Sequence, residues 1–375
     1  MAINLGTGSV QSAADLVEYC NSDTDTKWAN ERRKNGNSAP YGIKYWCLGN
    51  EMDGEWQICH KSADEYGRIA TETAKMMKWI DPDIKLTLCG SSGSAMPTYP
   101  EWDRIVLEYA YEYVDYISLH KYYEYPLRDV GRKEDFLASY LDFDSFIASV
   151  SSTVNYVKTL KRSKHDVRLS IDEWNVWHTG RQPAYEKKWE ISAPREENIY
   201  DMIDTTVFSS LICTLLNHCD TVKFACLAQL VNVLAPIVTG EDGKLLRQSI
   251  FYPFMLAAEH CCGEVMRTVV DCGSFDSVYG KADNICCSAV LSGDKLTVLA
   301  VNLSDKETEL DIVAEHFGNV AVTSNISIAD ENCFACNTFD NPDRILPNTE
   351  YYPEGRTTVR VKPYSVNFLF LSNVG

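Results

Sequence analysis

The sequence predicts an α/β domain over residues 1–262, followed by an antiparallel β-sandwich over residues 263–375. Two observations support this division. Up to about Cys262, short apolar segments alternate with amphipathic helical patterns, and beyond it the chain changes to strands of alternating polarity separated by turn residues. From the residues alone, strand alternating with helix fits either a doubly wound sheet or a barrel of the TIM type.

The first part contains six candidate strands, each bounded by polar or Gly-rich segments. Apart from the first, a three-residue stub, each is five or six residues long. Largely apolar runs of this length are typical of parallel strands that are buried on both faces. The six segments are residues 3–5, 43–48, 85–89, 116–120, 167–171 and 223–228.

Three helical patterns lie between these strands, at residues 62–80, 146–160 and 199–216. In the first, apolar residues recur at spacings of three and four. Ser62 is followed three residues later by Glu65, which resembles a capping box, and Asp81-Pro82 supplies a stop signal.

The second part shows β-type alternation at residues 296–303, 357–362 and 366–371. Turn-forming clusters at 292–294 and 341–343 separate these runs. Short alternating strands divided by turns are the pattern of an antiparallel sandwich.

The charge of the chain argues against nucleic acid and anionic membranes as partners. Lys and Arg number 35 against 53 Asp and Glu, which gives a net charge of −18. So much negative charge repels phosphate groups, and a neutral substrate fits better. No apolar run reaches the roughly 18 residues that a membrane span requires.

The N-terminus lacks the charged and apolar regions of a signal peptide, so we expect a cytoplasmic chain. Its 14 cysteines are then expected to be reduced and mostly buried thiols. The one C-x-x-C pair, Cys333 and Cys336, has no second pair or histidines nearby, and no histidine stands at metal-ligand spacing. No nucleotide-binding glycine motif is present, so we predict neither a metal nor a cofactor.

Two glutamates stand where a barrel would place catalytic groups. Glu51 follows the candidate strand 43–48, and Glu173 follows the strand 167–171. The carboxyl ends of barrel strands open into one cleft, so both side chains can face the same pocket. Glycoside hydrolysis requires such a pair, one as proton donor and one as nucleophile or base. Spacing alone leaves open that either glutamate is a solvated loop residue.

Longer motifs resemble the family-51 glycoside hydrolases, the intracellular α-L-arabinofuranosidases. They run from the first residues of the chain to its second part and are specific. The matching segments are residues 4–7 (NLGT), 46–53 (WCLGNEMD), 116–120 (YISLH), 170–177 (SIDEWNVW) and 225–236 (ACLAQLVNVLAP). The resemblance implies a (β/α)8 barrel with a C-terminal β-sandwich, and hydrolysis of terminal arabinofuranosyl residues with retention of configuration.

The resemblance also implies roles for individual residues. Glu51 matches the general acid/base and Glu173 the nucleophile. Arabinose-binding roles fall on five further residues: Asn50 at the sugar 2-hydroxyl, Tyr122 positioning the nucleophile, His120 on the same strand end, Trp177 as a wall of the subsite and Gln229 lining the pocket.

The retaining mechanism requires Glu173 to be ionised and Glu51 to begin protonated. We expect the charge of Glu173 to keep Glu51 protonated, and the two carboxyl groups to lie about 5–5.5 Å apart. Asp172 is also a carboxylate, but side chains alternate along a strand, so it should point away from the pocket. Trp46 lies inside a strand and is expected in the core.

The chain departs from the family at its N-terminal end. The family's barrel begins before the motif at 4–7, so we expect the first two of eight strands, with three arabinose-binding residues, to be missing here. Turnover should then be impaired. The alternatives are a carbohydrate-binding or assembly fragment, or an endo-β-glucanase or xylosidase on the same scaffold. Family members often form hexamers, which the resemblance suggests for this chain.

Overall fold

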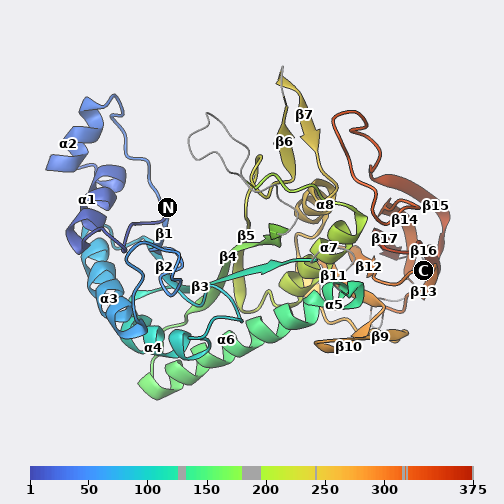
Figure 1. The fold of residues 1–375 in the computed structure, drawn as a ribbon, viewed down its shortest axis with the longest axis horizontal. Coiled ribbons are helices and arrows are strands. Elements are labelled where there is room, and N and C mark those ends of the chain that lie inside the picture. Colours follow the sequence, from blue (N-terminus) through green and yellow to red (C-terminus); the bar gives the residue numbers. More distant parts are fainter. Residues whose placement is uncertain (126–131, 180–195, 241–242, 315–316, 318–319, 374–375) are drawn as a thin grey trace. The chain divides into compact units, whose positions relative to one another are not determined.

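A five-stranded sheet organises the first part of the computed structural model, which describes residues 1–125, 132–179, 196–240, 243–314, 317 and 320–373 (Figure 1). The strands are β1 (Tyr45–Leu48), β2 (Lys85–Cys89), β3 (Tyr116–Tyr123), β4 (Arg168–Val176) and β5 (Val222–Leu227). Their spatial order is β1-β2-β3-β4-β5, and the pairs β1–β2 and β2–β3 are parallel.

This order decides between the two fold classes that the sequence left open. A doubly wound sheet reverses its strand order at a switch point, whereas in a TIM-type barrel each strand pairs with the next along the chain. The observed order follows the chain without reversal. The predicted strand at residues 3–5 contributes only a parallel bridge, in which Ile3 N donates to Cys47 O at 2.9 Å.

Helices lie between consecutive strands from β1 to β5, as the βα pattern predicts, and further helices precede β1 or follow β5. They are α1 (Val10–Asn21), α2 (Lys27–Lys34), α3 (Ala63–Ile80), α4 (Glu101–Ala110), the 3-10 turn η1 (Tyr111–Tyr113), α5 (Lys133–Leu137), α6 (Ser139–Lys161), α7 (Met202–Asn217) and α8 (Phe251–His260). Figure 1 shows α3 and α4 on the same side of β1 and β2. No helix in the described part of the chain has both the length and the apolar character needed to cross a membrane.

The three predicted helices are present, and one has the predicted cap. The Ser62 side chain accepts from Glu65 N at 3.4 Å, and Glu65 Oε2 accepts from Ser62 N at 3.0 Å, so the capping box at the start of α3 is confirmed. By contrast, α4 follows Pro100 and has no side-chain cap. Helix starts are recognised in a sequence by their capping residue, so this helix was not predicted.

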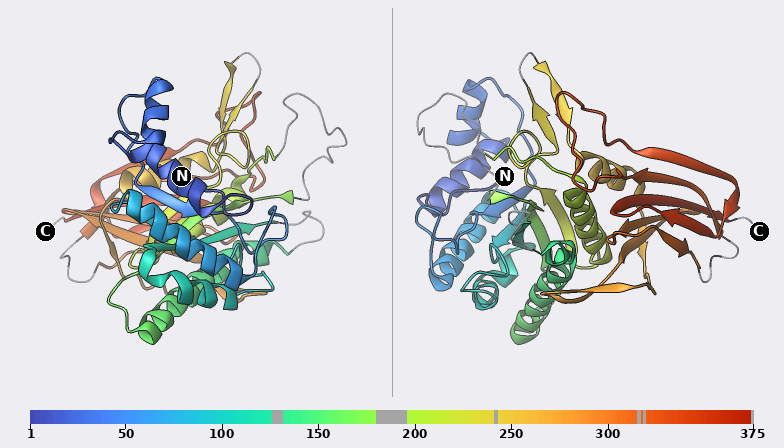
Figure 2. Two further views of the ribbon diagram at one scale, coloured as in Figure 1. Left: turned by 90° about the vertical axis from the view of Figure 1, so that its left-hand side faces the viewer. Right: turned by 45° about the vertical axis from the view of Figure 1, so that its right-hand side comes forward.

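The C-terminal part is an antiparallel sheet with a smaller second layer (Figure 2). Six strands pair in the order β15-β14-β17-β12-β11-β8. Strands β13 and β16 form a separate pair, and Leu310 and Val359 from it pack with Val322 and Leu369 of the large sheet in one apolar cluster. The predicted sandwich is therefore present. Its strands are β8 (Glu264–Met266), β11 (Ile285–Ser292), β12 (Lys295–Asn302), β13 (Thr308–Asp311), β14 (Val320–Ile328), β15 (Asn348–Arg356), β16 (Thr358–Val361) and β17 (Ser365–Asn373).

Two further strand pairs complete the described elements: β6 (Ile237–Thr239) with β7 (Leu245–Arg247), and β9 (Ser274–Ser277) with β10 (Gly280–Asp283). By packing, the chain divides into two compact units. Unit 1 comprises Met1–Lys121, Phe146–Trp174 and Thr221–Cys226, and unit 2 comprises Tyr122–Ser145, Asn175–Asp220 and Leu227–Gly375. The domain boundary at 262/263 stays a prediction.

The cysteines are less buried than expected. Of the 14, only Cys20, Cys89, Cys213 and Cys286 are buried. The remainder are half-buried or exposed, so the expectation of mostly buried thiols is wrong. Several lie on strands, where alternation turns every second side chain away from the covered face.

A buried tyrosine joins the ends of β1 and β2. The hydroxyl of Tyr66 on α3 donates to Leu48 O at 2.8 Å and accepts from Cys89 N at 2.7 Å. Its ring stacks on Trp102 at 5.4 Å. Leu48 and Cys89 are the last residues of their strands, so this hydroxyl satisfies two backbone groups that the sheet itself leaves without a partner.

Replacing Tyr66 by Phe should therefore destabilise the protein by about 1–3 kcal/mol, because two buried backbone groups lose their partner. Tyr109→Phe is the matched control, since it removes a hydroxyl that bonds Asp64 on an exposed surface. Urea unfolding of both variants measures the difference. Equal urea midpoints for the two variants would show that the Tyr66 hydroxyl stabilises the protein no more than the exposed hydroxyl of Tyr109.

Candidate active site

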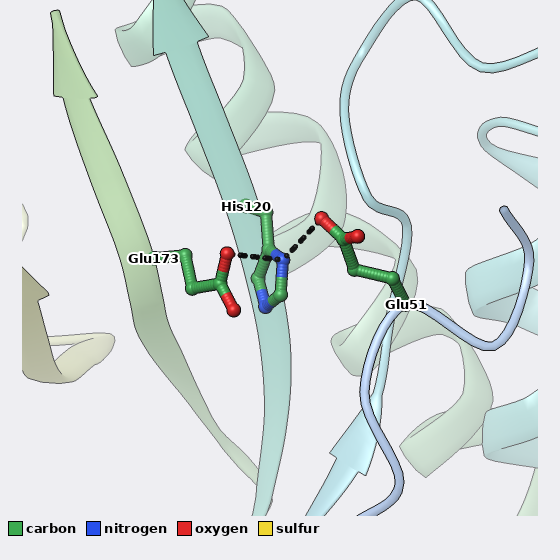
Figure 3. A group of neighbouring side chains, drawn as sticks. All are labelled: Glu51, His120 and Glu173. Carbon is green, nitrogen blue, oxygen red and sulfur yellow. Dashed lines mark hydrogen bonds and ion pairs between the residues drawn. The ribbon is translucent and has the colours of Figure 1, made fainter. Parts of the chain in front are cut away.

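Three ionisable side chains of unit 1 lie close together (Figure 3). Glu51 stands in the turn after β1, His120 lies on β3 and Glu173 on β4. Glu51 has a φ of 46°, in the left-handed region that non-glycine residues rarely adopt. Such backbone strain concentrates at functional sites.

The imidazole of His120 lies between the two carboxylates. Its Nδ1 is 3.0 Å from Glu51 Oε1 and 3.5 Å from Glu173 Oε2. One polar atom from each of the three side chains lies within 4.8 Å of the other two. The two glutamates that the sequence singled out are thus close neighbours, at a separation well below the roughly 6.5–9.5 Å of inverting glycosidases.

The second oxygen of Glu51 is held by the loop that follows it. Oε2 accepts from the indole Nε1 of Trp56 and, at 3.3 Å, from the amide of Gln57. Oε1 is therefore the oxygen that faces His120. Trp56 is 58% exposed. The sequence alone did not predict its hydrogen bond to Glu51.

Asp172 does not point away from this group, which corrects the prediction. Its Oδ1 lies 3.1 Å from His120 Nε2, and its Oδ2 accepts from the Cys47 thiol at 3.7 Å. The prediction assumed that only one face of β4 could reach the site, so that Asp172 and Glu173 could not both contact it. His120 instead presents one ring nitrogen to Asp172 and the other to Glu173, so neighbouring residues of β4 reach the same ring from its two edges.

These contacts set the protonation of His120. Burial lowers its pKa, but the contacts with Asp172 and Glu51 and the charges of Asp172 and Glu173 outweigh burial and raise the pKa to about 10. The imidazole is therefore a cation at neutral pH, and only 4% of its side chain is exposed.

The same cation changes the expected state of Glu51. Burial raises the pKa of Glu51, but the hydrogen bonds from His120 and Trp56 and the charge of His120 prevail and lower it below its ordinary value. The expectation that Glu51 begins protonated is therefore wrong for the free site. That expectation rested on the negative charge of Glu173, which by itself would raise the pKa of Glu51. The positive charge of His120 lies nearer to the Glu51 oxygens and lowers this pKa.

Other carboxylates and tryptophans of the motifs have structural positions. Asp53 is buried and accepts from Ser92 N at 3.0 Å, so it fixes the loop after β1. Trp46 is fully buried, which confirms its place in the core. Trp174, which follows Glu173, is also buried, with 1% exposure.

The other residues to which the sequence assigned binding roles have the following positions. Asn50 precedes Glu51 and is exposed. Tyr122 and Trp177 belong to unit 2, where their rings meet edge to face at 5.2 Å, and Trp177 Nε1 donates to Glu196 Oε2 at 3.1 Å. Gln229 also belongs to unit 2 and is exposed after β5.

Among the described residues, one group of His, Cys, Asp or Glu atoms is close enough together for a metal ion, and it is the same Glu51, His120 and Glu173. The histidine cation already balances carboxylate charge there, so we assign no metal to it. The absence of a cofactor stays a prediction.

The arrangement can carry out acid/base and nucleophilic chemistry on one substrate. Glu173 is the more accessible carboxylate, with 31% of its side chain exposed, and Glu51 is held on both oxygens. Nδ1 of the His120 cation faces Glu51, and Glu173 beside it is a carboxylate that can attack carbon.

Comparison with known proteins shows which family the chain resembles. Residues 4–146 match the α-L-arabinofuranosidase 1 domain, and residues 172–365 match the α-L-arabinofuranosidase C-terminal domain. The chain is 43% identical to the intracellular exo-α-(1→5)-L-arabinofuranosidase 1 of Bacillus subtilis, over 99% of this chain and 75% of that protein. It is 48% identical to the enzyme of the same kind from Acetivibrio thermocellus, over 80% of this chain and 61% of that protein.

Solved structures give the same result for the fold. The family-51 α-L-arabinofuranosidase AbfB of Bifidobacterium longum superposes with a TM-score of 0.91 at 34% identity, over 99% of this chain and 75% of that one. The arabinose complex of the Thermotoga maritima enzyme gives 0.84 at 29% identity, with the same coverage. On these matches, the chain belongs to the family-51 α-L-arabinofuranosidases, with a TIM-type barrel fold and a C-terminal β-sandwich.

Proposed function

We propose that the chain is a retaining exo-glycoside hydrolase that removes terminal α-L-arabinofuranosyl residues from arabinose-containing oligosaccharides in the cytoplasm. The observation that carries the proposal is the approach of Glu51 and Glu173 to opposite sides of Nδ1 of His120, with their oxygens within 4.8 Å. Family membership supports the substrate class, and the relatives named intracellular support the location.

Glu173 acts as the nucleophile. Its carboxylate attacks the anomeric carbon while the glycosidic bond breaks, and an arabinosyl ester forms. The close carboxylate spacing supports this retaining course, because an inverting enzyme needs room for a water molecule between its two carboxyl groups.

Glu51 acts as the general acid and then as the general base. It passes a proton to the leaving oxygen in the first step and takes one from water in the second. Its hydrogen bonds with Trp56 and His120 hold the carboxyl group in one orientation through both steps.

The family resemblance assigns arabinose-binding roles to Asn50, Tyr122, Trp177 and Gln229, and the proposal keeps those roles. Their residue types suit a small sugar, since amides bond hydroxyl groups and aromatic rings cover apolar faces. The Bacillus and Acetivibrio relatives are both named for the α-(1→5) linkage, which makes linear α-(1→5)-arabino-oligosaccharides the first substrates to test. Hexamer formation stays a prediction.

The chain spans 75% of the Bacillus protein and 61% of the Acetivibrio protein, so its own activity needs a direct test. The purified chain should release arabinose from 4-nitrophenyl α-L-arabinofuranoside and from arabinobiose. Binding of these compounds without any turnover would contradict the proposal and favour a binding or assembly fragment.

Glu173→Ala should lower kcat by roughly 10⁴-fold or more, because the covalent intermediate cannot form. Added azide should restore part of the turnover and give an arabinosyl azide of inverted configuration, since the anion enters the space that the side chain leaves. Glu72→Ala, at an exposed glutamate of α3, is the control and should retain activity. Full activity of Glu173→Ala would exclude Glu173 as the nucleophile.

Glu51→Ala should affect substrates according to their leaving group. With arabinobiose, whose leaving alcohol needs a proton, kcat/KM should fall by about 10²–10⁴-fold. With the 2,4-dinitrophenyl glycoside, which departs without a proton, kcat/KM should change little. Equal losses on both substrates would argue against acid catalysis by Glu51.

A further inference from the structure

His120 contacts a carboxylate through each ring nitrogen, and the proposed chemistry uses only one of these contacts. Nδ1 faces Glu51 at 3.0 Å and Glu173 at 3.5 Å, whereas Nε2 faces Asp172 at 3.1 Å. The Asp172 contact is a close ion pair, and Asp172 Oδ1 is buried.

Besides His120, three cysteine thiols lie near Asp172. Cys47 on β1 donates to it, and Cys89 on β2 and Cys226 on β5 lie near enough to feel its charge. Burial raises the pKa of all three thiols, that of Cys47 to about 12. His120 is a cation in contact with Asp172, at 3.1 Å.

We propose that Asp172 is a positioning residue that acts through His120, holding the Nε2 proton in place so that Nδ1 is the nitrogen that exchanges its proton with Glu51. The inference rests on the proposed function and deepens it. In this proposal the catalytic proton resides on the His120–Glu51 pair before the reaction, rather than on Glu51 alone.

The proton balance through one turnover is as follows. The Nδ1 proton moves to Glu51, and Glu51 protonates the leaving oxygen, which keeps the electron pair of the broken glycosidic bond. Glu173 forms the new bond to the anomeric carbon. Water then attacks that carbon and displaces Glu173, and its proton passes to Glu51 and back to Nδ1. One water is consumed, and His120 ends as it began.

The charges around the ring explain why Asp172 is needed. A neutral imidazole keeps one proton, on one nitrogen only. Two carboxylates lie on the Nδ1 side, and without an opposing charge they would retain the proton there. Asp172 supplies that opposing charge at Nε2, so that the proton facing Glu51 is the one released.

Asp172→Asn tests the inference because it keeps the size of the side chain and removes its charge. The first readout needs no turnover: ¹⁵N NMR of histidine-labelled protein, with the His120 signals assigned by their loss in His120→Gln. In the wild type His120 should stay doubly protonated until about pH 10. In Asp172→Asn its titration should move down by about 1–3 pH units, because an adjacent opposite charge is gone.

The second readout is the ratio of kcat/KM for arabinobiose to kcat/KM for the 2,4-dinitrophenyl glycoside. Both values are measured on one preparation, so a smaller folded fraction lowers them equally and leaves their ratio unchanged. In Asp172→Asn, kcat/KM for arabinobiose should fall about 100-fold or more, in the direction known for a histidine that loses the carboxylate fixing its tautomer. The 2,4-dinitrophenyl glycoside should lose much less. The alkaline limb of the pH profile should move to lower pH with the NMR titration.

Asp115→Asn is the matched control. Asp115 is a buried carboxylate that pairs with Lys78 and Lys85 before β3, five residues from His120 and so on the order of 16 Å away along the strand. That variant should leave the His120 titration and the substrate ratio unmoved.

The outcomes separate the two proposals. An unchanged His120 titration, or equal losses on both substrates, in Asp172→Asn would overturn the inference while leaving the hydrolase proposal intact. A wild-type chain without turnover would contradict the proposed function, and the NMR titration would still decide whether Asp172 controls His120.

Discussion

The placement of one buried imidazolium among three carboxylates is the interaction on which the site depends. Glu51, Asp172 and Glu173 would repel one another if they were brought together alone, and His120 offsets that repulsion at the centre of the group. The cost of burying the histidine is met by its contacts at both ring nitrogens. Removing any one carboxylate therefore changes the protonation of the others, and the group functions as a unit.

The barrel scaffold explains how residues far apart in the sequence reach this arrangement. Strands β1 to β4 lie side by side in the sheet, and the turn after β1 and the strands β3 and β4 supply the polar side chains of the site. The Tyr66 hydroxyl bonds one backbone group at the end of β1 and one at the end of β2, and the turn that bears Glu51 follows β1. Glu51 has a left-handed backbone conformation in this turn, and the indole of Trp56 donates a hydrogen bond to its second carboxylate oxygen.

Much of this could be predicted from the sequence, because it depends on local patterns. Strand β2 begins and ends at the predicted residues, and α3 has the predicted capping box. Helix α4 was not predicted, since nothing in its sequence caps its start. The strand order was also beyond the residues alone, because alternating strands and helices fit a doubly wound sheet equally well.

Within the site, the catalytic pair was predictable and its electrostatics were not. Glu51 and Glu173 follow strands, which is a local signal. The protonation of Glu51 depends on the distance to His120, 69 residues away, and no sequence pattern encodes that distance. The alternation rule failed for Asp172 for a similar reason, because a histidine ring accepts partners at both edges.

The most direct test of the central claim is to identify the residue that becomes bonded to the sugar. In the Glu51→Ala protein, a 2,4-dinitrophenyl α-L-arabinofuranoside should glycosylate the enzyme faster than water can release it, so the ester should accumulate. Mass spectrometry of the digested protein should then find one pentosyl group on Glu173. A pentosyl group on another residue, or none despite release of dinitrophenol, would contradict the account.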